Sequence, residues 1–457
     1  MTLLGPKVAA AKAVGTLVRA AGRGGGTSLP GKVLTRLEPH AIGLLARRLE
    51  HGSAVISATN GKTTTAAMSA SVLEHAGETL VHNQAGANMA GGVAAALAAA
   101  SRRGGRALSG GLGLFEVDEF WLGPLMGELR PRALLLGNLF RDQLDRFGEL
   151  EIIADRWAGV VAAHAGRTAL VLNADDPLVA DLGRAHAPLY FGVEDDAVAF
   201  AELQHAADSK HCRRCGHPYA YEAIYLAHLG RYHCPNCGAR RPEPSVVARS
   251  VELRGTRSAA FTLDSAYGSA RVELPLPGLY NVYNALGAAA LCLSLGAPLA
   301  AVVAGLEAVA PAFGRAETLD LDGRPTAIML VKNPAGANEV LRTLALEGAP
   351  LDLFGILNDN TADGRDISWV WDADWELLAP SVRHVTCSAT RAAELALRMK
   401  YAGVDGSRLT VIGPLRDGLD AALAEGEGPL YALPTYTALL ELRDLLSERG
   451  QVKGHWR

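Results

Sequence analysis

The chain has 457 residues, enough for about three domains of roughly 150 residues each. Hydrophobic residues make up 49% and charged residues 20% of the sequence, which excludes a wholly disordered chain. The net charge is −4, from 44 Lys and Arg against 48 Asp and Glu, so a protein that mainly coats nucleic acid is disfavoured.

The first segment, residues 1–50, is predicted to be helical, with a break near Gly22–Gly26. Lys7, Lys12 and Arg19 interrupt its first apolar run, so we expect no secretory signal and a cytoplasmic protein. A membrane-spanning helix is not expected either, because no run of 18 apolar residues occurs. An amphipathic helix on a membrane surface is one interpretation of the segment. Packing on the rest of the same chain is favoured over it.

From residue 51, short apolar strands alternate with helical sequence, such as the helix predicted at Thr64–Ala76. This alternation predicts an α/β fold with a parallel sheet covered on both faces. We assign residues 51–312 to a central domain, with an insertion at about 203–245 and a helix at Val282–Leu295. The predicted strands are Ser53–Ala58, Thr79–His82, Leu112–Val117, Ala133–Leu139, Thr168–Asn173, Ser250–Leu263 and Ala270–Leu276.

A second alternating set follows a stretch that is typical of a linker, Pro311–Arg315. Residues 313–457 are therefore predicted to form a smaller C-terminal α/β domain. Its expected strands are Ala327–Val331, Leu351–Leu357, His384–Ser388, Leu409–Ile412 and Pro429–Leu433.

The sharpest motif is a phosphate loop between a strand and a helix, Ala54-Val-Ile-Ser-Ala-Thr-Asn-Gly-Lys-Thr-Thr-Thr65. Backbone N–H groups at such a turn face an anion. Lys62 is expected to reach the β- and γ-phosphates of ATP, and the Thr63 hydroxyl to hold Mg²⁺. Ile56 stands where the general motif has Gly, so the general pattern is matched only in part. The candidate nucleotide-binding residues here are Asn60, Gly61, Lys62, Thr63 and Thr64.

Four cysteines lie in the insertion as two pairs, Cys212-x-x-Cys215 and Cys234-x-x-Cys237, with 18 residues between them. This spacing predicts a zinc site, and four thiolates leave no open position, so the zinc would be structural. Disulfides are the alternative, disfavoured because nothing suggests export. Ribbons of this type often bind nucleic acid, but a solvated basic rim is the favoured interpretation of Arg213, Arg214, Arg240 and Arg241.

The loop Ala58-Thr-Asn-Gly-Lys-Thr-Thr-Thr65 resembles that of the Mur ligase family, ATP-dependent enzymes that activate a carboxylate as an acyl phosphate. The resemblance implies that Glu116 binds Mg²⁺ with Thr63, and that Asn281 and Arg315 contact the nucleotide. Asn284 is a second candidate contact, and capping of the following helix is the alternative role for either Asn. Other segments match in the same order: Phe115-Glu-Val-Asp118, Asn173-Ala-Asp-Asp-Pro177, Gly278-Leu-Tyr-Asn-Val-Tyr-Asn-Ala285, Phe313-Gly-Arg315 and Lys332-Asn-Pro-Ala-Gly336.

One branch of the family resembles this chain more closely, namely the MurT subunits of lipid II isoglutaminyl synthases. The resemblance implies ATP-dependent amidation of the α-carboxylate of D-glutamate in the lipid II stem peptide, giving D-isoglutamine in peptidoglycan synthesis. It rests on the four-cysteine insertion and on three segments: Gly24-Gly-Gly-Thr-Ser-Leu-Pro-Gly31, Arg141-Asp-Gln-Leu-Asp-Arg-Phe-Gly148 and Asn358-Asp-Asn-Thr-Ala-Asp-Gly-Arg-Asp-Ile-Ser-Trp369.

Two features depart from the peptide-adding Mur ligases. Gln143 stands where those enzymes usually carry a His that helps to hold a second Mg²⁺, so a second metal site stays open. Only about 50 residues precede the phosphate loop, against the large UDP-sugar-binding domain of those enzymes, so a UDP-linked substrate is disfavoured.

The resemblance also implies a heterodimeric partner, a class-I glutaminase of the GatD type that supplies ammonia. An Asp of this chain would orient the partner's catalytic His. Asp363 and Asp366 are the candidates and are not separated by the sequence. An acidic loop that only docks the partner or caps a helix is the alternative. Lipid II as substrate would place the protein at the inner face of the cell membrane.

Two other functions remain open. Another Mur-fold amide ligase, adding glutamate to folates or an amino acid to a peptide, would work without a partner. Gln143 and the segment Asn358–Trp369 count against it. A zinc-ribbon NTPase that binds nucleic acid would need a basic domain, and the net charge of −4 counts against that.

Overall fold

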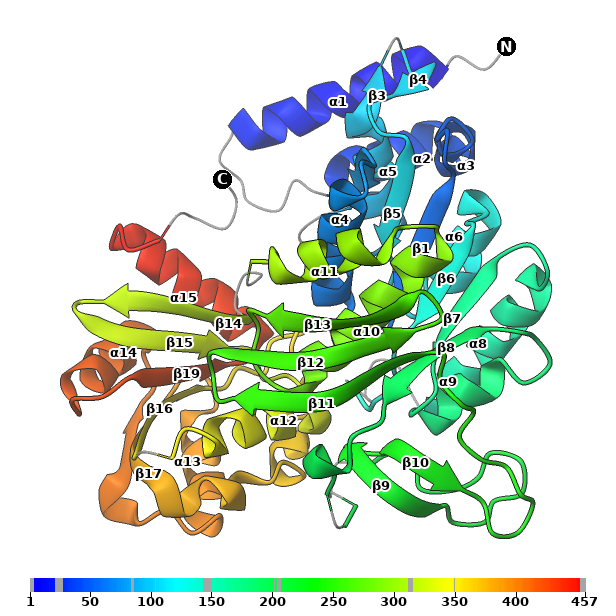
Figure 1. The fold of residues 1–457 in the computed structure, drawn as a ribbon. Helices are drawn as coiled ribbons and strands as arrows, with labels where there is room; N and C mark the ends of the chain where they lie inside the picture. The colour runs from blue at the N-terminus through cyan, green and yellow to red at the C-terminus, as the bar shows by residue number, and fades with distance from the viewer. Residues whose placement is uncertain are drawn as a thin grey trace.

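Two sheets organise the chain in the computed structural model (Figure 1). Nine of the strands up to Leu274 build one sheet, and the strands from Arg315 onward build a six-stranded sheet. The predicted domain boundary at 312–313 lies outside the described residues and stays a prediction. The structure describes residues 4–20, 28–83, 86–102, 104–142, 150–200, 202–203, 207–310, 315–348 and 350–452.

The nine-stranded sheet has the strand order β13-β12-β11-β8-β7-β6-β1-β5-β2. Neighbouring strands from β2 to β11 run parallel, as predicted, whereas β12 and β13 extend the sheet antiparallel. The strands are β1 (Ser53–Ser57), β2 (Leu80–His82), β5 (Leu112–Glu116), β6 (Ala133–Leu136), β7 (Ala169–Asn173), β8 (Leu189–Val193), β11 (Val246–Arg254), β12 (Ser258–Ser265) and β13 (Gly268–Leu274).

One strand prediction was wrong. The segment Ser250–Leu263 is not a single strand but a hairpin of β11 and β12, with Ala248 opposite Leu263. The chain reverses at Gly255, whose φ of 59° lies in the left-handed region that favours glycine. Strand β8 was not predicted at all.

Helices cover both faces of this sheet, and the alternating strand residues divide between two cores. Ile56 of β1 belongs to the core beneath α4, α10 and α11, whereas Val55 belongs to the core on the opposite face. The first face has α4 (Lys62–His75), α10 (Leu279–Ser294) and α11 (Leu299–Glu307), and the second has α5 (Ala90–Ala100), α6 (Leu122–Leu129), α8 (Leu150–His164) and α9 (Pro177–Leu182).

The N-terminal helices α1 (Leu4–Ala20), α2 (Leu29–Leu37) and α3 (Ala41–Ala46) extend the second layer. Leu4, Val8 and Ala11 of α1 are at most 4% exposed within that core, so α1 packs on its own chain. In the part of the chain that the structure describes, no helix is both long and apolar enough to cross a membrane.

The six-stranded sheet has the order β14-β15-β19-β16-β17-β18, parallel except for β14. Its first strand begins at Arg315, where only a linker was predicted. The strands are β14 (Arg315–Leu321), β15 (Arg324–Met329), β16 (Leu351–Ile356), β17 (Val382–Ser388), β18 (Leu409–Ile412) and β19 (Leu430–Pro434). The helices are α12 (Pro334–Ala345), α13 (Ala392–Tyr401), α14 (Leu415–Ala424) and α15 (Tyr436–Glu448).

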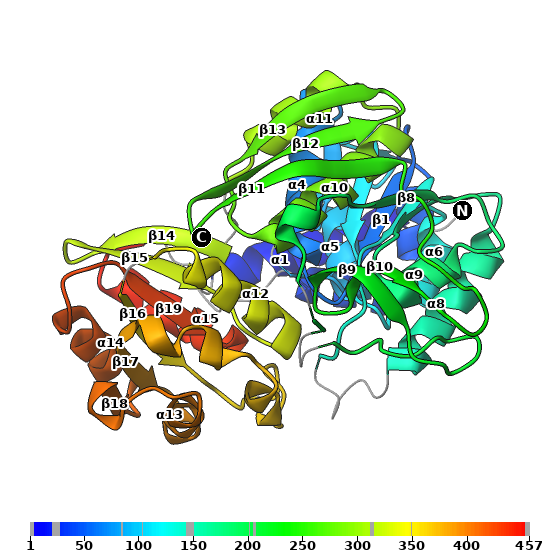
Figure 2. The same cartoon turned by 60° about the horizontal axis from the view of Figure 1, so that its bottom comes forward.

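The insertion between β8 and β11 forms a ribbon that hangs below the central sheet in Figure 1. Its hairpin consists of β9 (Ala220–Leu226) and β10 (Leu229–His233). In Figure 2, helix α12 lies between the two sheets, on the side of the molecule that carries the ribbon. The remaining short elements are β3 (Ser101–Arg102), β4 (Ala107–Leu108) and the 3₁₀ turns Asp196–Val198, Ser368–Trp371, Trp375–Leu377, Ala379–Ser381 and Gly406–Arg408.

Candidate nucleotide-binding and partner-facing site

The predicted phosphate loop connects β1, which ends at Ser57, to α4, which begins at Lys62. Gly61 precedes the helix with a φ of 81°. A Cβ atom at Gly61 would also lie 2.0 Å from the side-chain oxygen of Asn284. Glycine is therefore required at position 61 both by the backbone conformation and by the close approach of α10.

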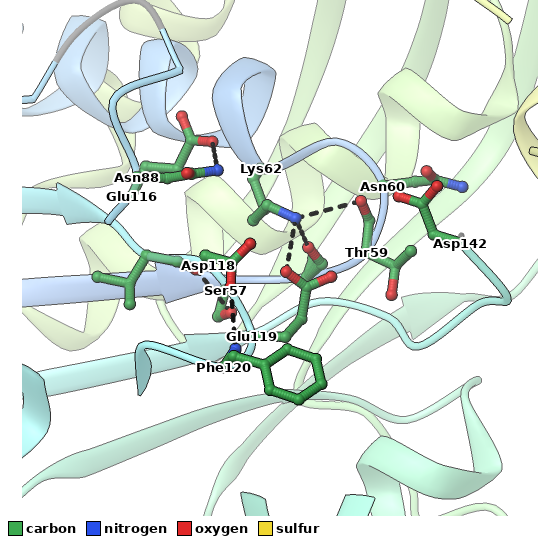
Figure 3. A network of polar contacts seen from close by, with 12 residues as sticks. Ser57, Thr59, Asn60, Lys62, Asn88, Glu116, Asp118, Glu119, Phe120 and Asp142 are labelled. Atoms are coloured by element: carbon green, nitrogen blue, oxygen red, sulfur yellow. Dashed lines mark hydrogen bonds and ion pairs between the residues drawn. The ribbon is translucent and has the colours of Figure 1, made fainter. Parts of the chain in front are cut away.

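Lys62 lies folded back over its own loop (Figure 3). Its Nζ donates to Glu119 Oε2 at 3.0 Å, to the Thr59 carbonyl at 3.3 Å and to the Ala58 carbonyl. Burial lowers the pKa of Lys62, but the neighbouring carboxylates of Glu119, Glu116 and Asp118 outweigh it and raise the pKa above its ordinary value. The ammonium thus stays charged at the place where the loop would meet a phosphate.

Glu116 and Thr63 are brought together, as the sequence predicted. The Thr63 hydroxyl donates to Glu116 Oε1 at 3.1 Å, and Asn88 Nδ2 lies 3.5 Å from the same oxygen. Glu116 ends β5, which runs parallel to β1, so the carboxyl ends of the two strands meet at one edge. A hydroxyl and a buried carboxylate are oxygen ligands of the kind that Mg²⁺ takes. The magnesium role itself stays a prediction.

The C-terminal segment reaches this loop through Lys332 and Asn333. Asn60 and Asn333 exchange two amide hydrogen bonds, of 3.2 and 2.9 Å. Lys332 forms an ion pair with Asp142 and lies 3.5 Å from the Thr59 carbonyl. The sequence motif around Lys332 gave no sign of these contacts, which join residues more than 180 positions apart.

A cavity opens beside the loop, between the central sheet, the ribbon and α12. Its polar lining includes Asn60, Gly61, Thr64 and Lys332. The apolar lining comes from five places in the chain: Phe140 after β6, Leu226 and Leu229 of the ribbon hairpin, Tyr283 of α10, Met329 and Leu330 at the end of β15, and Ala335 and Val340 of α12. A lining that combines phosphate-binding groups with apolar side chains suits a nucleotide.

Asn284, rather than Asn281, lines this cavity. Asn281 Nδ2 donates to the Pro277 carbonyl at 2.7 Å, and its Oδ1 accepts from Asn284 Nδ2 at 3.1 Å. Helix α10 begins earlier than predicted, with Gly278 as its N-cap, so neither Asn is the N-cap. Nucleotide contact by Asn281 stays a prediction, as does that by Arg315, whose side chain lies outside the described residues.

Asp363 and Asp366 differ sharply in their surroundings. Asp363 is 6% exposed and accepts the Thr437 N–H at 2.7 Å and the Thr437 hydroxyl, at the start of α15. Asp366 is exposed, and its Oδ1 accepts the Ser368 N–H at 2.8 Å, which lowers the pKa of Asp366 below its usual value. Asp363 therefore holds a helix in place, whereas Asp366 presents an ionised carboxylate at the surface.

A second cavity joins the two groups of candidate residues. Lys332 and Asn333 line it together with Asp363 and Asp366. Arg141 also lines it and forms ion pairs with Asp208 and, at 3.1 Å, with Asp372. Gln143, which stands where the peptide-adding Mur ligases usually carry His, belongs to residues 143–149, outside the described residues.

The four cysteines converge. The Sγ atoms of Cys212 and Cys237 lie 3.6 Å apart and those of Cys215 and Cys234 3.4 Å apart, and all four ligand atoms lie within 4.8 Å of one another. Tetrahedral zinc with Zn–S bonds of about 2.3 Å would place sulfurs roughly 3.8 Å apart, close to these values. All four cysteines are free thiols, so the disulfide alternative is not what the structure has.

The Asn173–Pro177 segment has a structural role. Asp176 caps α9 by accepting from the N–H groups of Leu178 and Val179. Asp175 is fully buried and accepts from Arg241 of the ribbon and, at 2.6 Å, from the Tyr283 hydroxyl. These bonds fasten the ribbon to the helix that walls the nucleotide cavity.

Comparison with known proteins agrees with this architecture. A model of the Mur ligase middle domain matches residues 56–239, and a model of the MurT ligase C-terminal region matches residues 330–439. The MurT subunit of the glutamine-hydrolysing lipid II isoglutaminyl synthase from Streptococcus pneumoniae is 32% identical over 94% of each chain. The subunit of that name from Staphylococcus aureus is 32% identical over 93% of this chain and 94% of its own.

Solved structures support the fold alone, because their identities are lower. A pseudomurein peptide ligase type C from Methanothermus fervidus aligns with a TM-score of 0.67 at 22% identity, covering 89% of this chain and 80% of its own. A UDP-N-acetylmuramoylalanyl-D-glutamyl-2,6-diaminopimelate–D-alanyl-D-alanyl ligase from Acinetobacter baumannii gives 0.65 at 18% identity, covering 91% and 80%. The chain thus belongs to the MurT family of lipid II isoglutaminyl synthase subunits and is built on the Mur ligase fold.

Proposed function

We propose that this chain is the synthetase subunit that amidates the α-carboxylate of D-glutamate in the lipid II stem peptide, using ATP and ammonia from a GatD-like glutaminase. The observation that carries the proposal is the second cavity. Lys332, which adjoins the phosphate loop, and Asp366, which faces outward, line the same space. A carboxylate activated at the loop would therefore lie next to the surface at which a partner could deliver ammonia.

The reaction has two steps. A carboxylate oxygen of the substrate attacks the γ-phosphorus of ATP, ADP leaves, and an acyl phosphate forms. The nitrogen of ammonia then attacks the acyl carbon, inorganic phosphate leaves, and the nitrogen loses a proton. Phosphoryl transfer depends mainly on positioning and on neutralising charge.

The loop residues have matching roles in this proposal. Lys62 exchanges its carbonyl and Glu119 partners for the β- and γ-phosphates. Glu116 and the Thr63 hydroxyl hold Mg²⁺, which when bound neutralises phosphate charge. Asn60, Gly61 and Thr64 surround the phosphates from the backbone side of the loop. The four thiolates of the ribbon hold a structural zinc.

Asp366 is the better candidate for the residue that orients the partner's His. A carboxylate in that role must be ionised and must reach a ring N–H of another subunit. Asp366 is exposed and has a lowered pKa, whereas both oxygens of Asp363 are occupied by Thr437. We assign Asp363 to the shaping of the segment that presents Asp366.

The test uses the chain purified with its co-expressed glutaminase, lipid II and Mg-ATP, with either glutamine or ammonium as the nitrogen source. Product mass is the readout. We expect amidated lipid II from both sources in the wild type. Asp366→Asn should lower the glutamine-driven rate by at least about tenfold and leave the ammonium-driven rate unchanged, because only glutamine hydrolysis needs the oriented His.

Asp363→Asn is the matched control, expected to lower the thermal stability of the complex and to reduce both rates together. If instead Asp363→Asn lowered only the glutamine-driven rate, the His-orienting role would belong to Asp363. No amidation of lipid II with either nitrogen source, in a complex that binds ATP, would overturn the proposed reaction.

A further inference from the structure

Glu339 of α12 is a buried acidic residue that the steps above do not use. Its side chain lines the nucleotide cavity, and the residue is only 2% exposed. Neither carboxyl oxygen has a hydrogen-bond partner among the described residues. Burial raises the pKa of Glu339 to about 7. The charge of Arg342 and the nearby Tyr280 backbone, which forms no hydrogen bond with the carboxyl group, lower the pKa in part. A buried carboxyl group without a partner costs free energy, so an apolar residue would be the more stable choice here.

The position of Glu339 along α12 relates it to the phosphate loop. Asn333, the N-cap of α12, pairs with Asn60 of the loop, so the start of the helix is fixed beside the phosphate-binding backbone. Glu339 lies six residues beyond Asn333, or about 9 Å further along the axis at 1.5 Å per residue. In a nucleotide, the group that follows the phosphates at that distance is the ribose.

The neighbouring amides of the cavity wall already have partners. Asn138 exchanges hydrogen bonds with the backbone of Asn60 in both directions. Asn284 accepts from Thr65 and donates to Asn281. The Glu339 carboxyl is thus a lining group whose acceptors are unfilled, and a ribose offers two adjacent hydroxyl donors to a carboxylate.

We propose that the Glu339 carboxylate accepts hydrogen bonds from the ribose hydroxyls of the bound nucleotide and so selects ribonucleotides over deoxyribonucleotides. The inference rests on the proposed nucleotide site but not on the identity of the amidated substrate. A carboxylate used in this way explains why a costly buried acid lines this cavity.

The experiment measures nucleotide binding to the whole complex by calorimetry, with Mg-ATP, 2′-deoxy-ATP and 3′-deoxy-ATP. The wild type should bind ATP at least about tenfold more tightly than either deoxy form, equal to about 1.4 kcal/mol. Glu339→Gln should weaken ATP binding by a similar factor and reduce the preference for the ribose hydroxyls to about threefold or less. Glu243→Gln, at an exposed position outside the cavity, should change neither value.

Two results would overturn the proposal. The first is equal binding of ATP and both deoxy forms by the wild type, a measurement that needs no variant to fold. The second is a Glu339→Gln variant that keeps the ribose preference and instead changes the preference for ATP over purine riboside triphosphate, which lacks the 6-amino group. That pattern would place the carboxylate at the base. If the complex selected the ribose but amidated no lipid II, the proposed reaction would be refuted and the ribose contact of Glu339 would stand.

Discussion

The phosphate loop and the four-cysteine ribbon are both conspicuous in the sequence, but the structure completes them in opposite ways. The ribbon takes all four sulfurs from residues 212–237, and Cys212 and Cys234 accept local backbone bonds from Gly216 and Gly238. The loop takes its partners from Glu116, Asn284 and Asn333, which are remote in sequence. A locally closed motif can be predicted completely from spacing, whereas a site closed by distant segments can be predicted only in part.

Removal of the Lys62 ammonium should have the largest effect. Lys62→Ala deletes the charge that would neutralise the phosphates, and we expect ammonium-driven amidation to fall by at least about a thousandfold. The metal content of the ribbon should stay at the wild-type value, because the ribbon's ligands are local. The rate and the bound zinc are measured on the same preparation. A variant that keeps a tenth of the activity would show that Lys62 is not needed for the transfer.

This comparison also explains what could be predicted from the sequence. Spacing alone indicated the cysteine cluster, and a strand followed by Gly-Lys-Thr indicated the loop. Glu119 and Glu339 were missed because no local pattern distinguishes them from ordinary surface polar residues. Asn333 lies in the matched segment Lys332–Gly336, but its pairing with Asn60 could not be predicted from that segment. Their importance depends on contacts that only the folded chain creates.

The fold shows the same limits. Strands buried on both sides, such as β1 and β16, were predicted to within one residue, because continuous apolar runs are unmistakable. Strands β11 and β12 were predicted as parts of one strand because Gly255 alone marks the turn between them. Strand β14 was not predicted because it is an edge strand rich in polar residues, and its pairing with β15 depends on tertiary context.

Glu339 provides the next prediction, a pH dependence of stability without nucleotide. Its pKa is about 7 in the folded chain against an ordinary 4.5, so the folded state retains a proton that the unfolded state releases between these values. The free energy of unfolding should therefore fall as the pH rises from about 4.5 to 7, by up to about 3 kcal/mol from this group. Urea unfolding at pH 5 and pH 8 should show Glu339→Gln more stable than the wild type at pH 8 only. Equal stability at pH 8 would mean that the carboxyl is not destabilising there.

Removal of the zinc proposed for the ribbon tests whether the two regions are independent. Leu226 and Leu229 of the ribbon hairpin wall the nucleotide cavity, and Arg241 fastens the ribbon to Asp175. Loss of the metal by Cys215→Ser should loosen this wall and weaken ATP binding by about three- to tenfold, with the loop intact. Calorimetry with Mg-ATP, alongside zinc analysis, measures both. Unchanged ATP affinity in a metal-free variant would show that the hairpin keeps its place without the metal, and the two sites would then be separate.

The smallest expected effect belongs to the Asn60–Asn333 pair, which connects the loop to α12. Asn333→Ala removes the N-cap bond to Gly336, at 2.8 Å, and both amide bonds to Asn60. The cap alone is worth about 1 kcal/mol of stability. Asp405→Ala is the matched control, because Asp405 caps a short turn by accepting the Ser407 N–H at 2.8 Å, far along the chain from the loop. Both variants should lose stability, but only Asn333→Ala should raise the KM for ATP, by a few-fold. If the KM for ATP rose equally in both, the amide pair would contribute to folding without positioning the loop, and α12 would be held at the nucleotide by its apolar contacts alone.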